Sequence, residues 1–331
     1  MLRAERITSA LDSSFWNIEA YDKTQSTNTL IKEKLRNNCP EGVVATALIQ
    51  EGGYGRQGRL WSSPLGGLYF SFALRPFAHD QGLDQKTIPT LSLVVALSLY
   101  RVLTDLGISC AQIKWPNDVL VDQKKVCGIS LEGVAGGICV GVGINAFPMM
   151  GQRALSQTYE TGYVGPLLVG QGTYSGEEGK QDLGFDSSVH HDSDANVTGS
   201  ASSFSSRSAA QGNQDADLPA LYEKNSNGTQ PFMANLSPFQ QAVLENLLAS
   251  FLNAFDYNYK TWLDQGFSAF LDEYNSLLFN VGEYVTLESV TSTTLFSGVV
   301  KGINKEGFLL LKQPDGQIIA TSSGEVHTRH N

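Results

Sequence analysis

QEGGYGRQGRLW, residues 50–61, follows the strand-like run VVATALIQ and contains the G-x-G-x-x-G spacing of a dinucleotide-binding turn. Such a turn needs a helix directly after the glycines, because the helix N-terminus carries the pyrophosphate. Here two serines and a proline follow at 62–64, and then comes the alternating strand pattern LYFSFALRP at 68–76. The sequence therefore excludes the nucleotide-binding fold of NAD enzymes and places a glycine loop between two strands.

The same loop has the composition of an anion-binding site of another kind. Its glycines allow backbone N–H groups to approach a ligand closely. Arg56 and Arg59 carry guanidinium forks that suit phosphate or carboxylate, and Trp61 offers a face on which a base could stack. From this segment alone, an ordinary mobile hairpin with exposed arginines is the alternative.

Residues 1–150 alternate between strand and helix patterns. Apolar spacings of three and four predict helices that begin at Ser26 or Thr27 and that cover 87–107. Strands are predicted at 15–22, 43–50 and 68–76, in a hairpin at 119–134, and at 137–145. Strands this apolar favour a sheet covered by helices. We predict an α/β (α+β) fold with a mixed sheet and helices on one side of it.

Residues 151–235 differ in composition from the rest of the chain. They are rich in serine and glycine, poor in large aliphatics and acidic in balance, so they cannot bury enough apolar surface to offset ordering entropy. We predict a flexible insertion, in which the apolar side chains of 159–169 could pack locally or onto the core. His190 and His191 have no further ligands near them in sequence, so we do not expect a metal site there.

Regular patterns return at residue 236. Ser237 is predicted to cap a helix with Pro238 at its first position, and the helices of 236–278 complete the first domain. The final segment, 279–331, contains short strand patterns separated by NKEG and PDG turns, which is typical of a small SH3-like β-barrel. The predicted organisation is therefore 1–150 and 236–278 as one domain, an insertion at 151–235, and a C-terminal barrel at 279–331.

Composition also limits the class of protein. The net charge of −10 argues against a nucleic-acid-binding surface. The four cysteines show no CxxC pairing, which favours a reducing compartment. The apolar run at 91–100 is short and interrupted by serines, and the N-terminus lacks the pattern of a secretory signal. We expect a soluble cytoplasmic protein that binds neither DNA nor a membrane.

Further motifs occur in a fixed order along the chain. They are STN (26–28), Gln50 with the glycine loop, KWPND (114–118), KVCGI (125–129), GVGIN (141–145) and the GEVHTR ending. In order and spacing they resemble the biotin–protein ligase family, in the short form without an N-terminal DNA-binding domain. The resemblance covers roughly 1–150 and 236–331, and it does not cover the insertion.

The resemblance implies an ATP-dependent ligase that makes biotinyl-AMP and pyrophosphate from biotin and ATP. It then implies transfer of biotin to a lysine of a biotin carboxyl carrier domain, by a monomer or a homodimer. Mg²⁺ would arrive on the ATP phosphates and not at a fixed protein site. The implied biotin-binding residues are Ser26, Thr27, Asn28, Gln50, Gly53, Arg56, Lys125, Gly128 and Gly141. The implied adenylate-binding residues are Arg56, Arg59, Trp61, Asn117, Asn145, Glu325 and Arg329. The implied catalytic residues are Arg56, Lys125, Asp118 and Lys114.

The chemistry of the implied reaction accounts for these residue types. A buried ureido ring needs matched hydrogen-bond donors and acceptors, and a valeryl chain needs a slot without protruding side chains. The first step brings two anions together, so cations must be positioned between them. The second step needs a carboxylate to accept the proton of the attacking lysine, and Asp118 suits that role. Capping of its own turn is the alternative for Asp118, and a structural role is the alternative for Glu325 and Arg329.

One residue departs from the family pattern, because Tyr54 stands where the glycine loop normally carries an arginine. We predict that adenylate formation survives on Arg56, Arg59 and Lys125 but that the adenylate is retained more weakly, which a Tyr54→Arg substitution would improve. A lipoate ligase or octanoyl transferase of the same fold is the nearest alternative, although the GRQGRLW and KWPND pair favours biotin. A biotin-responsive repressor is disfavoured because too few residues precede the first strand for a helix-turn-helix domain. A catalytically weakened biotin-binding module has only Tyr54 in its support.

Overall fold

The computed structural model describes residues 1–79, 84–148, 160–170, 235–289 and 293–328. A seven-stranded sheet forms the larger part, in the order β1-β2-β3-β7-β6-β5-β4. Strands β1 and β2 are parallel and the remaining neighbours are antiparallel, so the predicted mixed sheet is confirmed. The strands are β1 (Asn17–Thr24), β2 (Val43–Gln50), β3 (Leu68–Leu74), β4 (Ala111–Lys114), β5 (Asp118–Val121), β6 (Lys124–Val134) and β7 (Gly137–Ile144).

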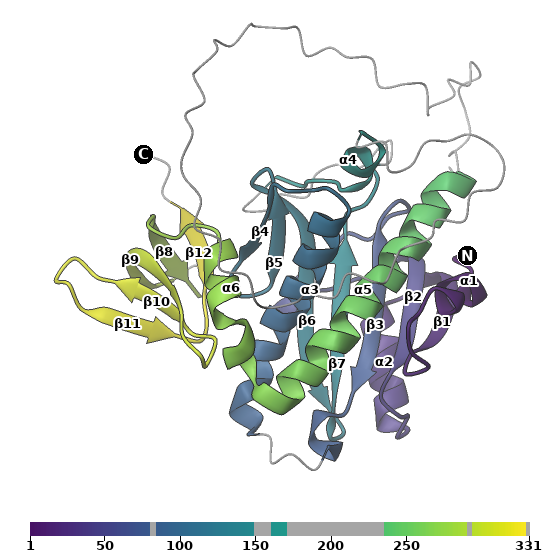
Figure 1. The fold of residues 1–331 in the computed structure, drawn as a ribbon, viewed down its shortest axis with the longest axis horizontal. Coiled ribbons are helices and arrows are strands. Elements are labelled where there is room, and N and C mark those ends of the chain that lie inside the picture. Colours follow the sequence, from purple (N-terminus) through teal and green to yellow (C-terminus); the bar gives the residue numbers. More distant parts are fainter. Residues whose placement is uncertain (80–83, 149–159, 171–234, 290–292, 329–331) are drawn as a thin grey trace, which may run out of the picture. The chain divides into compact units, whose positions relative to one another are not determined.

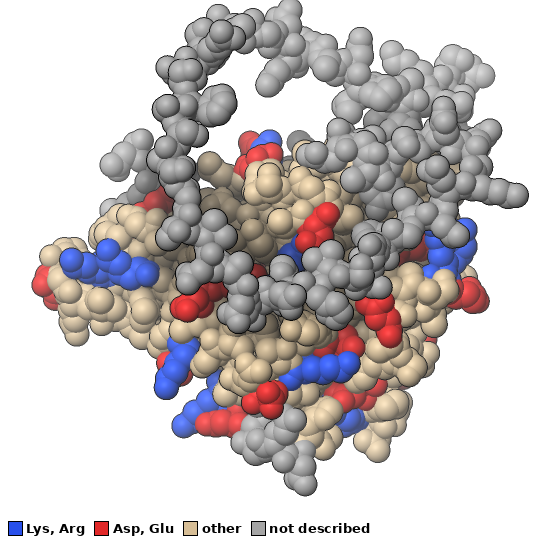
Figure 2. Space-filling view, viewed as in Figure 1, with Lys and Arg blue, Asp and Glu red and all other residues tan. Residues whose placement is uncertain are grey.

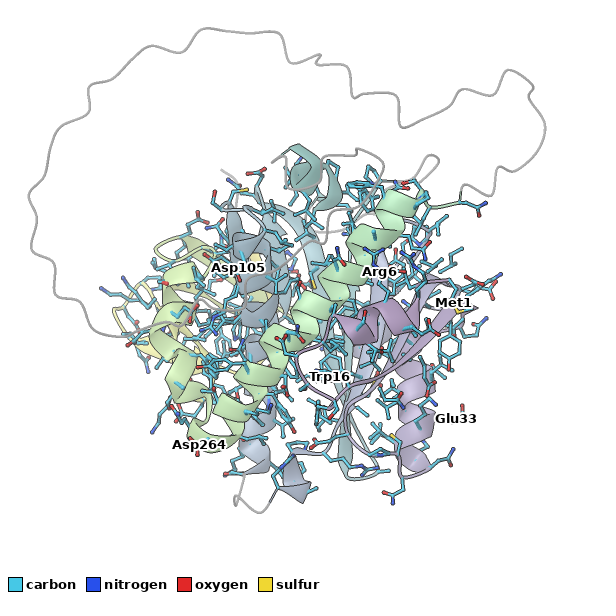
Figure 3. The ribbon with its side chains drawn as sticks, turned by 45° about the vertical axis from the view of Figure 1, so that its right-hand side comes forward. Met1, Arg6, Trp16, Glu33, Asp105 and Asp264 are labelled. Carbon is cyan, nitrogen blue, oxygen red and sulfur yellow. The ribbon has the colours of Figure 1, made fainter. Side chains whose placement is uncertain are left out.

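Two long helices cover one face of this sheet, α3 (Leu91–Asp105) and α5 (Pro238–Gln265) (Figure 1). Ser237 caps α5 in a capping box with Gln240, as its sequence predicts. The side chain of Trp16 packs against Phe72 of the sheet and Phe255 of α5, with ring centroids 5.5 and 6.2 Å apart (Figure 3). Aromatic burial of this kind joins α5 to strands that are far away in the sequence.

The prediction that helices lie on one side of the sheet is wrong. Helix α2 (Thr27–Arg36) packs on the opposite face, where Ile31 and Leu35 are buried against Val43, Ala45 and Cys139. The strands are apolar on both faces because both faces are covered. This second helix positions the STN motif, because Ser26 precedes its first turn.

The segment Gln85–Asp105, a 3-10 turn (Gln85–Thr90) followed by α3, is long and apolar enough to span a membrane by length and composition alone. Helix α3 is, however, part of the core. Its apolar residues from Leu91 to Leu103 are almost all buried in the main hydrophobic cluster. Burial between the sheet and α5 therefore accounts for its apolar composition.

Part of the predicted insertion belongs to the main fold. Residues 160–170 include the short helix α4 (Gly165–Gly170), and Val164 and Leu168 are buried in the core. Thr161 pairs with Lys125 in a parallel bridge. The alternative that the apolar residues near 159–169 pack onto the core is thus confirmed. The rest of the predicted insertion, with His190 and His191, lies almost entirely outside the described residues.

The C-terminal part is a five-stranded antiparallel sheet, in the order β11-β10-β9-β8-β12, consistent with an SH3-like barrel. A 3-10 turn (Phe267–Phe270) and α6 (Leu271–Leu277) lead into it. Trp115 Nε1, in the KWPND motif, donates to the carbonyl oxygen of Gly307 at 2.9 Å. The strands are β8 (Tyr284–Glu288), β9 (Thr294–Ile303), β10 (Leu309–Lys312), β11 (Ile318–Thr321) and β12 (Glu325–Thr328).

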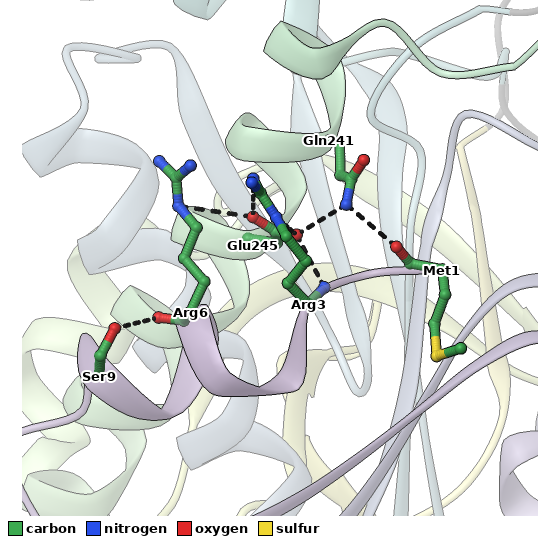
Figure 4. A network of polar contacts seen from close by, with 6 residues as sticks. All are labelled: Met1, Arg3, Arg6, Ser9, Gln241 and Glu245. Atoms are coloured by element: carbon green, nitrogen blue, oxygen red, sulfur yellow. Dashed lines mark hydrogen bonds and ion pairs between the residues drawn. The ribbon is translucent and has the colours of Figure 1, made fainter. Parts of the chain in front are cut away.

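The short helix α1 (Ala4–Ser9) is joined to the start of α5 through a buried carboxylate (Figure 4). Glu245 accepts from Arg3 Nη2 at 2.8 Å and from Arg3 Nε at 3.0 Å, and it also pairs with Arg6. Gln241 donates to the same carboxylate at 3.0 Å. Burial raises the pKa of Glu245, but these hydrogen bonds and the Arg3 charge outweigh burial and lower the pKa below 4.5.

Glu245→Gln is expected to lower the free energy of unfolding at pH 7 by about 1.5–3 kcal/mol, the range for a hydrogen bond to a charged group. Because the pKa is lowered in the folded state, this contribution is complete above about pH 4.5 and is lost as pH falls through the folded pKa. The difference between the two proteins in urea unfolding should therefore shrink in acid. Glu33→Gln, on the exposed face of α2, is the control. An equal loss in both variants would contradict the prediction.

Candidate active site

A cavity of about 390 Å³ lies between the glycine loop, the seven-stranded sheet and the strands β8 and β12. Its walls come from segments that are far apart in the sequence, so the fold and not local sequence assembles it. Most of the residues implied by the sequence motifs line it: Thr27, Asn28, Gln50, Arg56, Arg59, Trp61, Lys114, Asn117, Asp118, Lys125, Gly128, Gly141 and Glu325.

One side of the cavity is a chain of hydrogen-bonded polar side chains, here called the floor network: Gln50, Thr27, Ser71, Asn28 and Ser130. Gln50 Oε1 accepts from the backbone N–H of Thr27 at 2.8 Å, and Thr27 Oγ1 lies 2.7 Å from Ser71 Oγ. Ser71 Oγ donates to Asn28 Oδ1 at 2.6 Å, and Asn28 Nδ2 donates to Ser130 Oγ at 3.1 Å. Small side chains that alternate donors and acceptors suit a flat polar ligand.

The glycine loop folds back on itself as an irregular hairpin. The N–H of Gly55 donates to the carbonyl of Arg59 at 2.8 Å, and the N–H of Trp61 donates to that of Gly53 at 2.9 Å. A left-handed residue, Gln57, lies at its tip. Gly53 does not line the cavity, but a Cβ there would lie 2.4 Å from Ser63 Oγ. Gly53 therefore serves the close packing of the hairpin.

Two arginines from this loop form a cationic wall. Arg56 Nη1 donates to Asn117 Oδ1 at 3.0 Å, and Asn117 Nδ2 donates to the carbonyl of Ile129 at 2.8 Å. Arg59 Nη1 lies 2.5 Å from Glu325 Oε2, so the C-terminal sheet holds the second guanidinium. Burial would raise the pKa of Glu325, but Arg59 and then Lys114 lower it. The KWPND motif and the GEVHTR ending thus each hold one arginine.

Two lysines and a carboxylate lie beside this wall. Lys125 Nζ lies 2.8 Å from Asp118 Oδ2, whereas Asp118 Oδ1 is buried and accepts no hydrogen bond from the part of the chain that the structure describes. Lys114 is buried, and burial lowers its pKa to about 8, partly offset by Asp118. The positive charges suit the binding of an anion, and the carboxylate oxygen that can still accept a hydrogen bond suits proton transfer.

The indole of Trp61 lies over two glycines on adjacent strands. Gly128 and Gly143 are direct partners in the β6–β7 register. A Cβ at Gly128 would lie 2.8 Å from Trp61 Cζ3, and a Cβ at Gly143 would lie 2.4 Å from Trp61 Nε1. Lys125 Nζ lies 5.3 Å from the centre of the indole. Only glycine at these two positions lets the ring lie against the sheet.

Two other implied residues that the structure describes, Ser26 and Asn145, do not line the cavity. Ser26 is buried at the start of α2, and its side chain does not cap the helix. Asn145 donates to the carbonyl of Lys125 at 3.1 Å, and its own carbonyl accepts from Val164 at 3.1 Å, so it ties β7 to residues 160–165. Arg329 lies outside the described residues. Within the described ranges, no group of three His, Cys, Asp or Glu side chains could hold a metal ion.

Several cavity residues were not among those implied for binding or catalysis: Ser130, Gly143, Glu288, Ser289 and His327, together with Tyr54, which the sequence marked only as a departure from the family pattern. Strand alternation could have found two of them, because Ser130 shares a face with Gly128, and Gly143 shares a face with Gly141. Glu288 on β8 is the register partner of Glu325 on β12, and its Oε2 lies 3.7 Å from Nε2 of His327 on β12. Their position depends on how the C-terminal sheet meets the first sheet, which no local pattern encodes.

Two parts of the chain match protein families. Residues 20–146 match the biotin/lipoate A/B protein ligase family, and residues 281–328 match the biotin protein ligase C-terminal domain. The first match includes nearly every cavity residue on the seven-stranded sheet and its loop. The second includes those contributed by the C-terminal sheet.

Known proteins of similar sequence are also named as ligases. The bifunctional ligase/repressor BirA of Salmonella typhimurium is 35% identical over 153 residues, 44% of this chain and 45% of that protein. The biotin–[acetyl-CoA-carboxylase] ligase of Paracoccus denitrificans is 37% identical over 133 residues, 37% of this chain and 52% of that protein. The chain thus spans about half the length of these relatives.

Among solved structures, the biotin protein ligase from Aquifex aeolicus in complex with biotin and ATP has the same fold. Its TM-score is 0.62 at 22% identity, over 95% of this chain and 99% of that one. The fold, the two matched domains and the relatives agree. Residues 20–146 are therefore similar to the biotin/lipoate A/B protein ligase family, and residues 281–328 are similar to the C-terminal domain of biotin protein ligases.

Proposed function

We propose that the protein activates biotin with ATP and then transfers the biotinyl group to a lysine of a biotin carboxyl carrier domain. The observation that carries this proposal is the cavity itself. It places a polar floor network next to a cationic wall, with the glycines of β6 and β7 between them. A ligand with a flat polar head, an apolar chain and a carboxylate matches that order.

In the first step, a biotin carboxylate oxygen attacks the α-phosphorus of ATP, and pyrophosphate leaves as the P–O bond to it breaks. Lys125, Arg56 and Arg59 would offset the repulsion between the two anions. Mg²⁺ on the phosphates would supply further charge neutralisation.

In the second step, the amine of the carrier lysine attacks the acyl carbon, and AMP leaves with the electrons of the C–O bond. The amine must lose a proton to do so. Asp118 Oδ1 would accept that proton, because its other oxygen is already held by Lys125 and Oδ1 is not. No covalent enzyme intermediate is needed.

A carrier domain as partner agrees with the charge of the chain. On the face drawn in Figure 2, Lys and Arg side chains are interspersed with Asp and Glu, and the net charge is −10. This pattern supports a protein partner over nucleic acid. A cytoplasmic location is supported by the four cysteines, all of which are free thiols.

Biotin-dependent exchange of labelled pyrophosphate into ATP tests the first step directly. Exchange that requires biotin and is lost in Arg56→Gly would support the ligase. Exchange with lipoate in place of biotin would favour the lipoate-ligase alternative. Exchange with neither acid would exclude an adenylating enzyme and favour a binding module.

The pH profile of this exchange should depend on Lys114. Its folded pKa of about 8 lies below its ordinary value of 10.5, so its positive charge is present below pH 8 and is lost above it. We expect kcat/KM for ATP to fall up to tenfold per pH unit above about pH 8, since this ratio reports groups of the free enzyme. Lys114→Arg should flatten the profile, because arginine stays charged. A fall that persists unchanged in Lys114→Arg would assign the titration to another group.

A further inference from the structure

The glycine loop makes a polar contact near each of its ends, one with the floor network and one with Glu132. At its C-terminal end, Ser63 Oγ accepts from Gln50 Nε2 at 2.8 Å. At its N-terminal end, Tyr54 Oη donates to Glu132 Oε1 at 2.9 Å. Glu132 lies two residues after Ser130 on β6, so it is on the same face of the sheet. The loop thus spans the cavity between two polar contacts.

The contact of Tyr54 is built from three separate elements. Lys32 of α2 places its Nζ 2.7 Å from Glu132 Oε2, and the same ammonium lies 5.0 Å from the centre of the Tyr54 ring. Lys32 and Glu132 are largely shielded, with 19% and 33% of their side chains exposed. The glutamate is therefore charge-balanced, and its second oxygen is available to the phenol.

We propose that Tyr54, held by Glu132 and Lys32, is a positioning residue that fixes the glycine loop before any nucleotide binds. Fixing the loop keeps Arg56 and Arg59 at the cavity wall, where Asn117 and Glu325 hold them. The loop then loses little conformational freedom when a triphosphate enters. The catalytic consequence rests on the proposed function, whereas the fixing of the loop does not.

Tyrosine suits this role for a chemical reason. Its ring supports the Lys32 ammonium, and its hydroxyl donates to a carboxylate. Burial raises the pKa of Tyr54, and the contact with Glu132 raises it further, whereas the contact with Lys32 lowers it. The net pKa is raised, so the phenol remains a hydrogen-bond donor at neutral pH. An arginine at this position would add a second cation beside Lys32.

Amide hydrogen exchange of the peptide that spans residues 51–62 tests the loop in the unliganded full chain. Tyr54→Phe, which keeps the ring, should exchange at least fivefold faster than the wild type. Glu132→Gln is a second variant that weakens the same contact. If both act through one bond, the double variant should exchange no faster than the faster single variant, and additive effects would overturn the shared contact.

The chain contains a matched control for this experiment. Tyr21 Oη donates to Glu19 Oε2 at 2.7 Å, and Lys34 Nζ lies 2.7 Å from Glu19 Oε1. This is the same trio of side chains on β1 and α2, and none of the three lines the cavity. Tyr21→Phe should leave exchange of the loop unchanged. An equal acceleration in Tyr21→Phe and Tyr54→Phe would overturn the proposal.

A kinetic readout separates positioning from general destabilisation. In pyrophosphate exchange, Tyr54→Phe should raise KM for ATP three- to tenfold and change kcat less than twofold. The substitution lowers the fraction of molecules whose loop is in the binding conformation, but it leaves the reacting groups unchanged. A fall in kcat with unchanged KM would overturn the positioning role. If Tyr54→Phe speeds amide exchange of the loop but the wild type shows no pyrophosphate exchange, the Tyr54 contact is supported and the proposed function is rejected.

Discussion

Lys125→Met is expected to reduce biotin-dependent pyrophosphate exchange by about 10²–10³-fold, the usual cost of removing one positioned charge-stabilising donor. Lys125 Nζ lies 2.8 Å from Asp118 Oδ2 and 5.3 Å from the Trp61 ring, at the junction of the floor network and the cationic wall. Methionine keeps most of the side-chain length but removes the charge. It also leaves the Asp118 carboxylate without its cation, so a second anion would oppose the reaction.

The neighbouring residue provides the control for this prediction. Lys124 lies on the same strand but points to the other side, where it pairs with Glu160 at 3.1 Å and is half exposed. Lys124→Met should retain exchange within about twofold, because exposed ion pairs contribute little. Rates for the two variants that differ by less than threefold would reject the assigned role of Lys125. Initial rates at saturating biotin and ATP are the required measurement.

Gly141→Ala is expected to weaken biotin binding by about 10²-fold. A Cβ at this position would lie 2.1 Å from Asn28 Oδ1 and 2.6 Å from Ser130 Oγ, so the methyl group must displace the centre of the floor network. Displacement of Asn28 breaks its bonds with Ser71 and Ser130. Overpacking of this kind should also lower stability by about 1–3 kcal/mol.

Gly133→Ala controls for the change of backbone propensity. Gly133 lies on β6, and a Cβ there would meet no atom within 4 Å. Isothermal calorimetry with biotin and thermal unfolding should show wild-type behaviour for this variant. Wild-type biotin affinity in Gly141→Ala would mean that the floor network does not hold the ligand. A loss of stability without a loss of affinity would point to the same conclusion.

Much of the fold could be predicted because its signals are local. β2 has its predicted bounds, and α5 begins at Pro238 behind a serine cap, since apolar spacing and capping chemistry are written in adjacent residues. The grouping of the motif residues around one cavity followed from the family resemblance. Composition left open whether the apolar residues near 159–169 pack locally or onto the core, because it does not show which partners bury Val164 and Leu168.

The unpredicted parts of the site depend on contacts between distant segments. In the sequence, Tyr54 is recognised only as a replacement for the arginine of the family pattern. Its partners Glu132 and Lys32 lie on β6 and α2, so they are identified only from the three-dimensional structure. Trp61 was assigned to adenine from the motif, and its packing over Gly128 and Gly143 depends on the pairing of β6 with β7. The role of each cavity residue remains a prediction for the experiments above.

The position of α5 in the chain has a consequence for synthesis. All seven strands of the main sheet have left the ribosome once Ile144 has emerged, but the helix that covers Phe70 and Phe72 ends only at Gln265. At ordinary translation rates the intervening residues take on the order of 10 s. During that interval Phe70 and Phe72 lack their contacts with α5, and Arg3 next to α1 lacks its partner Glu245. Aggregation through these aromatic side chains therefore competes with folding of the nascent chain until α5 is synthesised.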